Sequence, residues 1–122
     1  MVILVAEDHD DFRLAISNIL KADGFTVLTT YDGRAALELS RCYPGTIDLL
    51  LSDVDMPRMD GLVLYRHIAA QRPEIKVLMM SGDLLATEQV VMKGLPFLQK
   101  PFRHTALRNA VEALLGAIPP LP

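Results

Sequence analysis

A short apolar segment of the chain leads directly into two carboxylates. Leu49–Leu51 are consecutive leucines, and Asp53 and Asp55 follow them with one residue between the two acids. A run this short and this apolar is typical of a strand that is buried on both faces. Open parallel sheets bind their ligands at the carboxyl ends of their strands, so we expect Asp53 to lie at such a site. A carboxylate there can act as a metal ligand, a base or a nucleophile.

A second apolar run, Val2–Ala6, also ends in acidic residues, Glu7 and Asp8. If the two strands are neighbours, Glu7, Asp8 and Asp53 meet at one edge of the sheet. Carboxylates that lie so close together repel one another unless a cation lies among them. Oxygen ligands in an open cleft suit Mg²⁺, which keeps several waters and commonly partners a phosphoryl group. The sequence has no cysteines and histidines at the spacing of a zinc site.

Two further strand ends carry residues that could bind phosphoryl oxygens. Val77–Met80 is followed by Ser81, and Phe97–Gln99 is followed by Lys100. An ammonium is a compact point charge for one phosphoryl oxygen, and a hydroxyl can donate a hydrogen bond to another. Taken singly, Ser81 is more simply a helix cap and Lys100 a surface lysine. Their position at the ends of apolar runs, like that of the carboxylates, favours one shared site.

The segments between the strands have the pattern of helices. They are residues 12–20, 34–40, 62–69, 84–93 and 107–115. Apolar residues recur at helical spacing in the first, third and fifth of them, which end near Gly24, Pro73 and Gly116. With Thr26–Thr30 as the remaining strand, five strands alternate with five helices. This order predicts an α/β fold with a doubly wound five-stranded parallel sheet flanked by five helices.

The order of the motifs resembles that of the receiver domains of two-component response regulators. The resemblance covers the chain from Val2 to about Leu115 and rests on five segments. They are Glu7-Asp8, Asp53 with Met56-Pro57, Asp60-Gly61, Ser81-Gly82 and Phe97-Leu98-Gln99-Lys100-Pro101-Phe102. It implies a flavodoxin-like fold and a phosphorylation switch. Residues 1–116 would form the receiver domain, and residues 117–122 a proline-rich tail or the start of a linker.

The resemblance also implies a metal site and a nucleophile. Asp53 would be the residue that is phosphorylated, and Asp53 and Asp8 would bind Mg²⁺ directly. Glu7 would hold the ion through water, and the backbone carbonyl of Asp55 would supply the third protein ligand. The Asp53 carboxylate would then attack phosphorus in line, as a covalent nucleophile.

For the phosphoryl group, the resemblance implies Ser81 and Lys100, which with Asp53 would complete the catalytic set. Phe97 would be the aromatic residue whose conformation, together with Ser81, forms the switch. The expected donor is the phosphohistidine of a histidine kinase or phosphotransfer domain. The protein would not be an ordinary enzyme, because it would catalyse only its own phosphorylation and dephosphorylation. An output domain or a second copy would bind through the fourth helix, fifth strand and fifth helix.

Several features depart from the family pattern. Asp55 places a carboxylate where Met or Asn is common, and its side chain is expected beside the phosphoryl group. Ser81 replaces the more common Thr. The interval from Ser81 to Lys100 is a few residues short, and Gly94 and Pro96 are expected to end the fourth helix early. The segments around Ser81 and Lys100 look most like receivers attached to hybrid sensor kinases, and a single-domain regulator is the alternative.

An alternative from another class of protein shares the local signals. Leu51–Asp55 resembles the first motif of haloacid-dehalogenase-type phosphatases, in which Asp53 would be the nucleophile and Asp55 the general acid/base. Those enzymes carry their acidic pair after the lysine, whereas Glu7-Asp8 precedes it here, and Met56-Pro57 is foreign to their motif. A receiver-like module that is never phosphorylated is disfavoured because no key position has been lost.

The composition narrows the functional classes further. The 122 residues suit a single α/β domain, and a net charge of −3 gives no electrostatic basis for binding nucleic acid or an anionic membrane. Cys42 is the single cysteine, so an internal disulfide is impossible, as expected of a cytoplasmic protein. Val2–Ala6 is too short for a signal peptide, and no apolar run approaches the length of a membrane span.

Overall fold

Strands and helices alternate along residues 1–116, the part of the chain that this computed structural model describes. The strands are β1 (Val2–Ala6), β2 (Thr26–Thr30), β3 (Leu49–Asp53), β4 (Lys76–Ser81) and β5 (Phe97–Gln99). The helices are α1 (Asp10–Ala22), α2 (Gly33–Cys42), α3 (Gly61–Gln71), α4 (Leu84–Met92) and α5 (His104–Leu115). All ten elements lie where the sequence pattern predicts them. The predicted tail, residues 117–122, lies outside the described residues.

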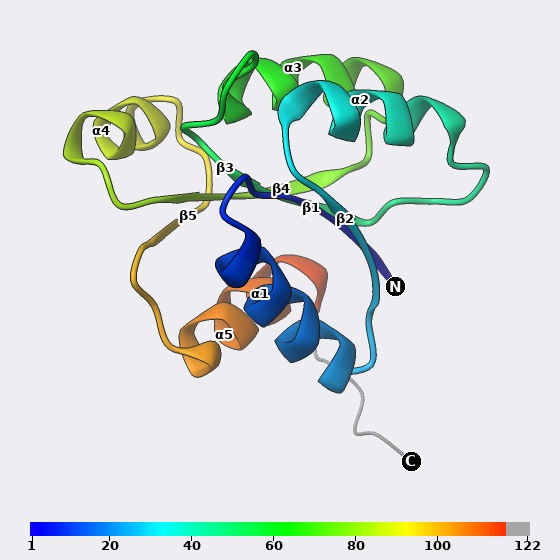
Figure 1. Ribbon diagram of the computed structural model, residues 1–122, viewed down its shortest axis with the longest axis horizontal. Coiled ribbons are helices and arrows are strands. Elements are labelled where there is room, and N and C mark those ends of the chain that lie inside the picture. The colour runs from blue at the N-terminus through cyan, green and yellow to red at the C-terminus, as the bar shows by residue number, and fades with distance from the viewer. Residues whose placement is uncertain (117–122) are drawn as a thin grey trace.

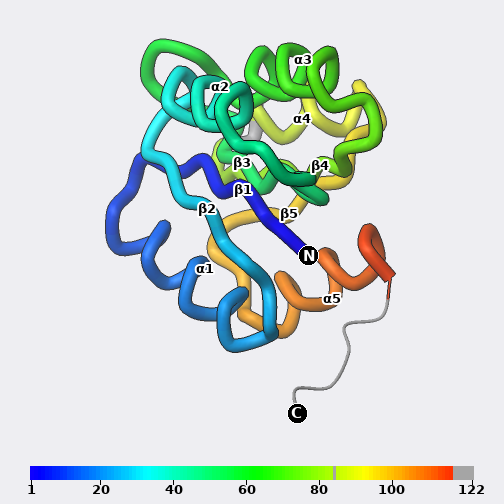
Figure 2. Tube along the Cα trace, turned by 90° about the vertical axis from the view of Figure 1, so that its right-hand side faces the viewer, coloured from blue at the N-terminus to red at the C-terminus, as the bar shows by residue number. Residues whose placement is uncertain are grey.

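The five strands form one parallel sheet in the order β2-β1-β3-β4-β5. Helices α2, α3 and α4 cover one face of this sheet, and α1 and α5 cover the other (Figure 1). A view turned by a quarter turn shows the same layers on either side of the strands (Figure 2). The predicted doubly wound architecture is therefore confirmed.

The core is divided by the sheet into two layers because successive side chains of a strand point to opposite faces. In β1, Ile3 and Val5 pack in the layer with α1 and α5, whereas Leu4 and Ala6 pack in the layer with α2, α3 and α4. All four are fully buried, as are the leucines Leu49–Leu51 of β3. Burial on both faces explains why these strands are continuous apolar runs rather than alternating ones.

The register of the strands brings the predicted polar residues to one edge. Ala6 pairs with Ser52, Asp53 pairs with Met80, and Ser81 pairs with Gln99. The residues that follow β1 and β5, Glu7 and Lys100, therefore lie level with the carboxyl ends of β3 and β4. The backbone N–H of Lys100 donates to the carbonyl of Ser81 over 2.9 Å, which continues the ladder past the end of β5.

Helix α4 is short, as the sequence predicts. It has nine residues, against ten to thirteen in the other helices of the described chain. Gly94 ends it with a φ of 70°, a left-handed conformation that favours glycine. None of the helices within residues 1–116 has the length and apolar character needed to cross a membrane.

Candidate functional site

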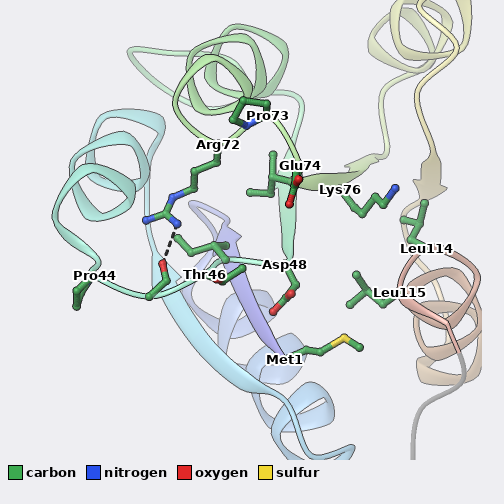
Figure 3. A pocket seen from close by; sticks show the side chains of 13 residues that line it. Met1, Pro44, Thr46, Asp48, Arg72, Pro73, Glu74, Lys76, Leu114 and Leu115 are labelled. Carbon is green, nitrogen blue, oxygen red and sulfur yellow. Dashed lines mark hydrogen bonds between the residues drawn. The ribbon is translucent and has the colours of Figure 1, made fainter.

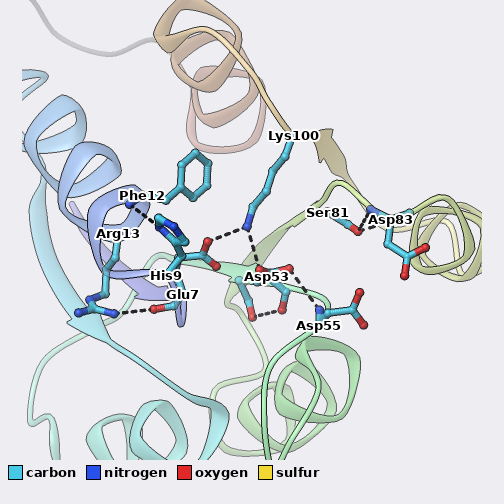
Figure 4. A network of polar contacts seen from close by, with 10 residues as sticks. Glu7, His9, Phe12, Arg13, Asp53, Asp55, Ser81, Asp83 and Lys100 are labelled. Atoms are coloured by element: carbon cyan, nitrogen blue, oxygen red, sulfur yellow. Dashed lines mark hydrogen bonds and ion pairs between the residues drawn. The ribbon is translucent and has the colours of Figure 1, made fainter.

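The carboxyl edge of the sheet carries a network centred on Asp53, the last residue of β3 (Figure 4). Lys100 follows β5 and donates from Nζ to Asp53 Oδ2 over 2.8 Å and to Glu7 Oε1 over 2.6 Å. The backbone N–H of Asp55 donates to the other carboxylate oxygen, Asp53 Oδ1, over 3.2 Å. Three of the predicted site residues, from the ends of three different strands, are thus in direct contact.

Lys100 is held as a cation by this network. Burial lowers the pKa of its ammonium, but hydrogen bonds to Asp53 and Glu7 outweigh burial, so the net effect is a raised pKa. A lysine that stays charged while its side chain is only 21% exposed is suited to attract an anionic group. The interpretation of Lys100 as an ordinary surface lysine is therefore wrong.

Glu7 is the most buried acid of the site and is fully shielded from solvent. Its pKa is raised to about 7, first by burial and then by the nearby Asp53 carboxylate, against the opposing effect of Lys100. Its second oxygen, Oε2, is buried and has no hydrogen-bond partner among the described residues. A buried carboxylate oxygen without a hydrogen-bond partner destabilises the folded state unless it binds a proton, a water or a cation.

The carboxylate oxygens of the acidic cluster are suitable ligands for a divalent cation. Glu7, Asp8 and Asp53 each offer one carboxylate oxygen, and these oxygens lie within 4.8 Å of one another. Asp8 is exposed and Asp53 nearly buried, so the cluster opens to solvent on one side. Hard oxygens with an open side suit Mg²⁺, which retains part of its water shell. The orphaned Oε2 of Glu7 agrees with this assignment, since a hydrated cation would supply its missing donor.

The Asp55 carboxylate is not part of this three-carboxylate cluster. It is exposed, and slight burial together with the negative charge of Asp83 raises its pKa. Asp83 lies in the loop after β4, where it caps α4 by accepting from the N–H of Leu85. The structure thus places Asp55 at the mouth of the site, facing the loop after β4. Whether its backbone carbonyl binds a metal stays a prediction.

Ser81 ends β4 with its side chain buried, but the hydroxyl is turned toward the following loop. Its Oγ accepts from the N–H of Asp83 over 3.0 Å and donates to the carbonyl of Asp83 over 3.3 Å. The cap of α4 is Asp83, so the interpretation of Ser81 as that cap is wrong. Phe97 lies on the neighbouring strand, partly buried against the core layer beneath α4.

The structure adds site residues that the sequence pattern does not single out. Arg58, in the loop after β3, donates from a terminal guanidinium nitrogen to Asp32 Oδ2 over 3.0 Å. Asp32 is buried and also caps α2, so the ion pair ties this loop to the loop after β2. Arg58 has a φ of 72°, a left-handed conformation that is strained for a residue with a side chain. Hydrophobic spacing does not reveal that a residue in the loop after β3 has a left-handed backbone conformation.

Two further residues line the same edge. Arg13 of α1 donates to the backbone carbonyl of Glu7 over 2.9 Å and forms a hydrogen-bonded ion pair with the Asp10 carboxylate. His9 caps α1 by accepting from the N–H of Phe12 over 3.2 Å, so it lies beside the site without joining the network. Asp10 and Asp11 lie in the first turn of α1, where negative charge is favourable beside the amino-terminal end of the helix dipole.

A separate hollow of about 680 Å³ lies at the opposite, amino-terminal edge of the sheet (Figure 3). The guanidinium of Arg72 donates to the carbonyl of Ser40 in the last turn of α2 and to the carbonyls of Tyr43 and Gly45 in the loop before β3. The carboxylate of Asp48 accepts from the N–H of Val2. The side chains of Arg72 and Asp48 thus hold the backbone at this edge of the sheet.

The raised pKa of Glu7 predicts how stability depends on pH without metal. The folded state binds the Glu7 proton more tightly than the unfolded chain, so stability falls as the pH rises from 4.5 to above 7. This contribution is on the order of 3 kcal/mol, because a tenfold change in proton affinity corresponds to about 1.4 kcal/mol. Urea denaturation of the parent and of Glu7→Gln at pH 5 and pH 8, in a metal chelator, measures it.

In that experiment, the gain in stability from Glu7→Gln should be large at pH 8 and small at pH 5. Saturating Mg²⁺ should reduce the gain at pH 8, since the ion would bind the folded state in its charged form. An equal effect of the substitution at both pH values would contradict the raised pKa.

Comparison with known protein families agrees with the geometry. The family model described as "Response regulator receiver domain" matches residues 3–112. The receiver protein CpdR of Brucella abortus is 32% identical over 118 residues, which cover 94% of this chain and 97% of CpdR. The sensor kinase CckA of the same organism is 34% identical over 119 residues, covering 93% of this chain but 12% of that kinase.

One solved structure shows the same fold. The receiver domain of the sensor histidine kinase PA1611 from Pseudomonas aeruginosa matches with a TM-score of 0.83 at 24% identity. The match covers 95% of this chain and 98% of that domain. That structure holds a magnesium ion in its active-site cleft.

Proposed function

Since the chain belongs to the response regulator receiver domain family, we propose that Asp53 is the phosphoacceptor of a two-component signalling system. Receiver domains are signalling phosphoacceptors. The observation that carries the assignment to Asp53 is the contact of its carboxylate with the Lys100 ammonium, 2.8 Å away, within a cluster of acids at the carboxyl edge. The rival reading as a haloacid-dehalogenase-type phosphatase is excluded by the family match over residues 3–112.

The proposed reaction moves a phosphoryl group from a phosphohistidine to Asp53. A carboxylate oxygen of Asp53 forms a bond to phosphorus while the bond from phosphorus to the imidazole nitrogen breaks, and the imidazole leaves with the electron pair. Lys100 exchanges its bond to Asp53 Oδ2 for one to a phosphoryl oxygen, where charge collects in the transition state. Hydrolysis of the resulting acyl phosphate at the same site is also part of this proposal.

Mg²⁺ fits the proposed reaction through residues already in place. Asp8 and Asp53 would bind it directly, Glu7 through water, and the backbone carbonyl of Asp55 as a further ligand. When bound, the ion would neutralise charge on the phosphoryl oxygens and on the acidic cluster. The second oxygen of Glu7, buried without a donor, supports this assignment.

The partners follow from the donor chemistry. The phosphohistidine belongs to a histidine kinase or phosphotransfer domain, which would place this domain in the cytoplasm beside such donors. The chain spans 97% of one relative and 12% of the other. A single-domain regulator and a receiver within a hybrid sensor kinase are therefore both compatible with its length. An output partner or a second copy would bind at α4, β5 and α5.

Phosphorylation by a small-molecule donor tests the proposal. The chain is incubated with acetyl phosphate and Mg²⁺ and examined by intact-mass spectrometry. We expect the addition of one phosphoryl group per chain and its loss when the metal is chelated. Absence of label under saturating donor and metal, or label that is indifferent to chelation, would overturn the proposed function.

Asp55 should slow phosphorylation by anionic donors while strengthening the metal site. Its carboxylate at the mouth of the site repels an incoming phosphodonor by about 2 kcal/mol before screening by salt and by the cation. We therefore expect Asp55→Asn to bind Mg²⁺ less tightly and to be phosphorylated several-fold faster at saturating Mg²⁺. Titration with Mg²⁺ and initial rates of labelling measure the two effects. Unchanged affinity and rate would mean that the side chain acts on neither.

Ser81 and Phe97 are proposed as the switch. Phosphorylation would draw the Ser81 hydroxyl away from the Asp83 backbone toward a phosphoryl oxygen. The ring of Phe97, which is only partly buried, would then move into the space that is vacated. NMR spectra of the Phe97 ring with and without beryllofluoride test the coupling. Identical ring environments in the two states would remove Phe97 from the switch.

A further inference from the structure

The ammonium of Lys100 lies over the ring of Phe12 as well as between two carboxylates (Figure 4). The distance from Nζ to the centroid of the Phe12 ring is 4.5 Å, within the range of a cation–π interaction. An ammonium has three N–H groups, and the bonds to Glu7 and Asp53 use two of them. The ring face of Phe12 thus lies against a side of the ammonium that the carboxylates leave free.

Phe12 is held in this position from two directions. It lies in the first turn of α1, where its backbone N–H donates to the cap residue His9. Its ring meets that of Phe102 edge to face, with centroids 5.4 Å apart and an angle of 68° between the rings. Phe102 follows Lys100 by two residues, so α1 and the loop after β5 meet at this aromatic pair. The ring is therefore a fixed surface for the ammonium.

The proposed transfer changes the surroundings of Lys100 but leaves Phe12 in place. Before transfer, Asp53 Oδ2 is one of the two anionic partners of the ammonium. During transfer, Lys100 must release this partner and follow the phosphoryl oxygens. Glu7 and the ring of Phe12 are the contacts that would persist through this exchange. An aromatic face attracts a cation by its quadrupole without forming a fixed hydrogen bond, so it allows small displacements of the ammonium.

We propose that Phe12 is a positioning residue for phosphoryl transfer, whose ring holds the Lys100 ammonium in place while Lys100 exchanges Asp53 for a phosphoryl oxygen. The inference rests on the proposed function of Asp53. An aliphatic side chain of similar size would fill the same space but would not attract the cation. Lys100 would then be free to sample positions away from the phosphoryl group, and the rate of transfer would fall.

Graded fluorination of the Phe12 ring tests this role without changing the fold. Phenylalanines with one, two and three fluorines are incorporated at position 12, because each fluorine weakens attraction of a cation while the ring keeps its shape. The initial rate of Asp53 labelling by acetyl phosphate is measured at saturating Mg²⁺. The logarithm of the rate should fall steadily with fluorine number, to about three- to tenfold below the parent with three fluorines.

Matched variants separate the electrostatic role from packing. Phe12→Tyr should keep the parental rate, and Phe12→Leu should be as slow as the trifluorinated protein. The same fluorinated residues at Phe25, a core position with no cation over its ring in the described chain, should leave the rate unchanged. Circular dichroism and melting temperatures confirm that each variant is folded.

A rate at position 12 that does not respond to fluorination would overturn the inference, even if Phe12→Leu is slow, because packing alone would explain that result. Whether or not the rate responds to fluorination at position 12, the parent protein should be labelled at Asp53. If the parent itself takes no label, the proposed function fails instead, so the two failures are distinguishable.

Discussion

Replacing Asp53 by asparagine should abolish phosphorylation of the chain by acetyl phosphate. The amide is neutral and is not a nucleophile toward phosphorus, whereas it can still accept a hydrogen bond from Lys100 or from the Asp55 backbone. The fold should therefore persist while the chemistry is lost. Intact-mass spectrometry of the variant beside the parent, at equal Mg²⁺ and donor, gives the comparison.

Asp60→Asn is the matched control for this substitution. Asp60 lies at the end of the loop that follows Asp53. It caps α3 by accepting a hydrogen bond from the N–H of Val63 over 2.8 Å. Asparagine is as good a helix cap as aspartate, so the control should be labelled to the parental level. Stoichiometric label on the Asp53→Asn protein would show that another residue accepts the phosphoryl group.

Gly61→Ala should destabilise the fold by about 3 kcal/mol or more. A Cβ at this position would lie 2.1 Å from the backbone carbonyl oxygen of Asp53 and 3.0 Å from Ser52 Oγ. The N–H of Gly61 also donates to the carbonyl of Val54 over 2.8 Å, so the backbone cannot move away without losing that bond. The clash is with backbone rather than with a flexible side chain. The free energy of unfolding, measured by urea denaturation, should show the full effect.

Gly82→Ala serves as the comparison for this prediction. The nearest atoms to a Cβ at Gly82 belong to Lys100 at 3.7 Å, which is an ordinary contact, and the backbone of Gly82 is not left-handed. We expect a change within about 1 kcal/mol, in the stabilising direction because the unfolded chain loses freedom. Equal stabilities of Gly61→Ala and the parent would contradict the close approach of the start of α3 to the end of β3.

Much of the fold could be predicted because the central strands β1, β3 and β4 are buried on both faces. Continuous apolar runs such as Leu49–Leu51 cannot be amphipathic surface elements, and each ends at a polar residue. In a parallel sheet all such ends share one edge, so the meeting of Glu7, Asp53 and Lys100 follows once the strands are adjacent. The sequence likewise predicts the short α4, since Gly94 and Pro96 interrupt its helical pattern.

The remaining features depend on side-chain direction across elements that are distant in sequence. Phe12 belongs to the apolar stripe of α1, and periodicity by itself predicts only a core residue there, because it does not reveal that a cation from residue 100 lies over the ring. The ion pair of Arg58 with Asp32 joins residues 26 positions apart through a left-handed backbone residue. The turn of the Ser81 hydroxyl toward Asp83 is a choice of rotamer that the residue type does not decide.

The most direct test of the central claim is to locate the phosphoryl group on the chain. An acyl phosphate is reduced by borohydride to an alcohol, which converts a phosphorylated aspartate to homoserine and leaves unmodified carboxylates intact. The chain is phosphorylated with acetyl phosphate and Mg²⁺, reduced, digested and sequenced by tandem mass spectrometry. We expect homoserine at position 53 and nowhere else. Homoserine at position 8 or 55 in place of position 53, or its absence from a fully labelled chain, would contradict it.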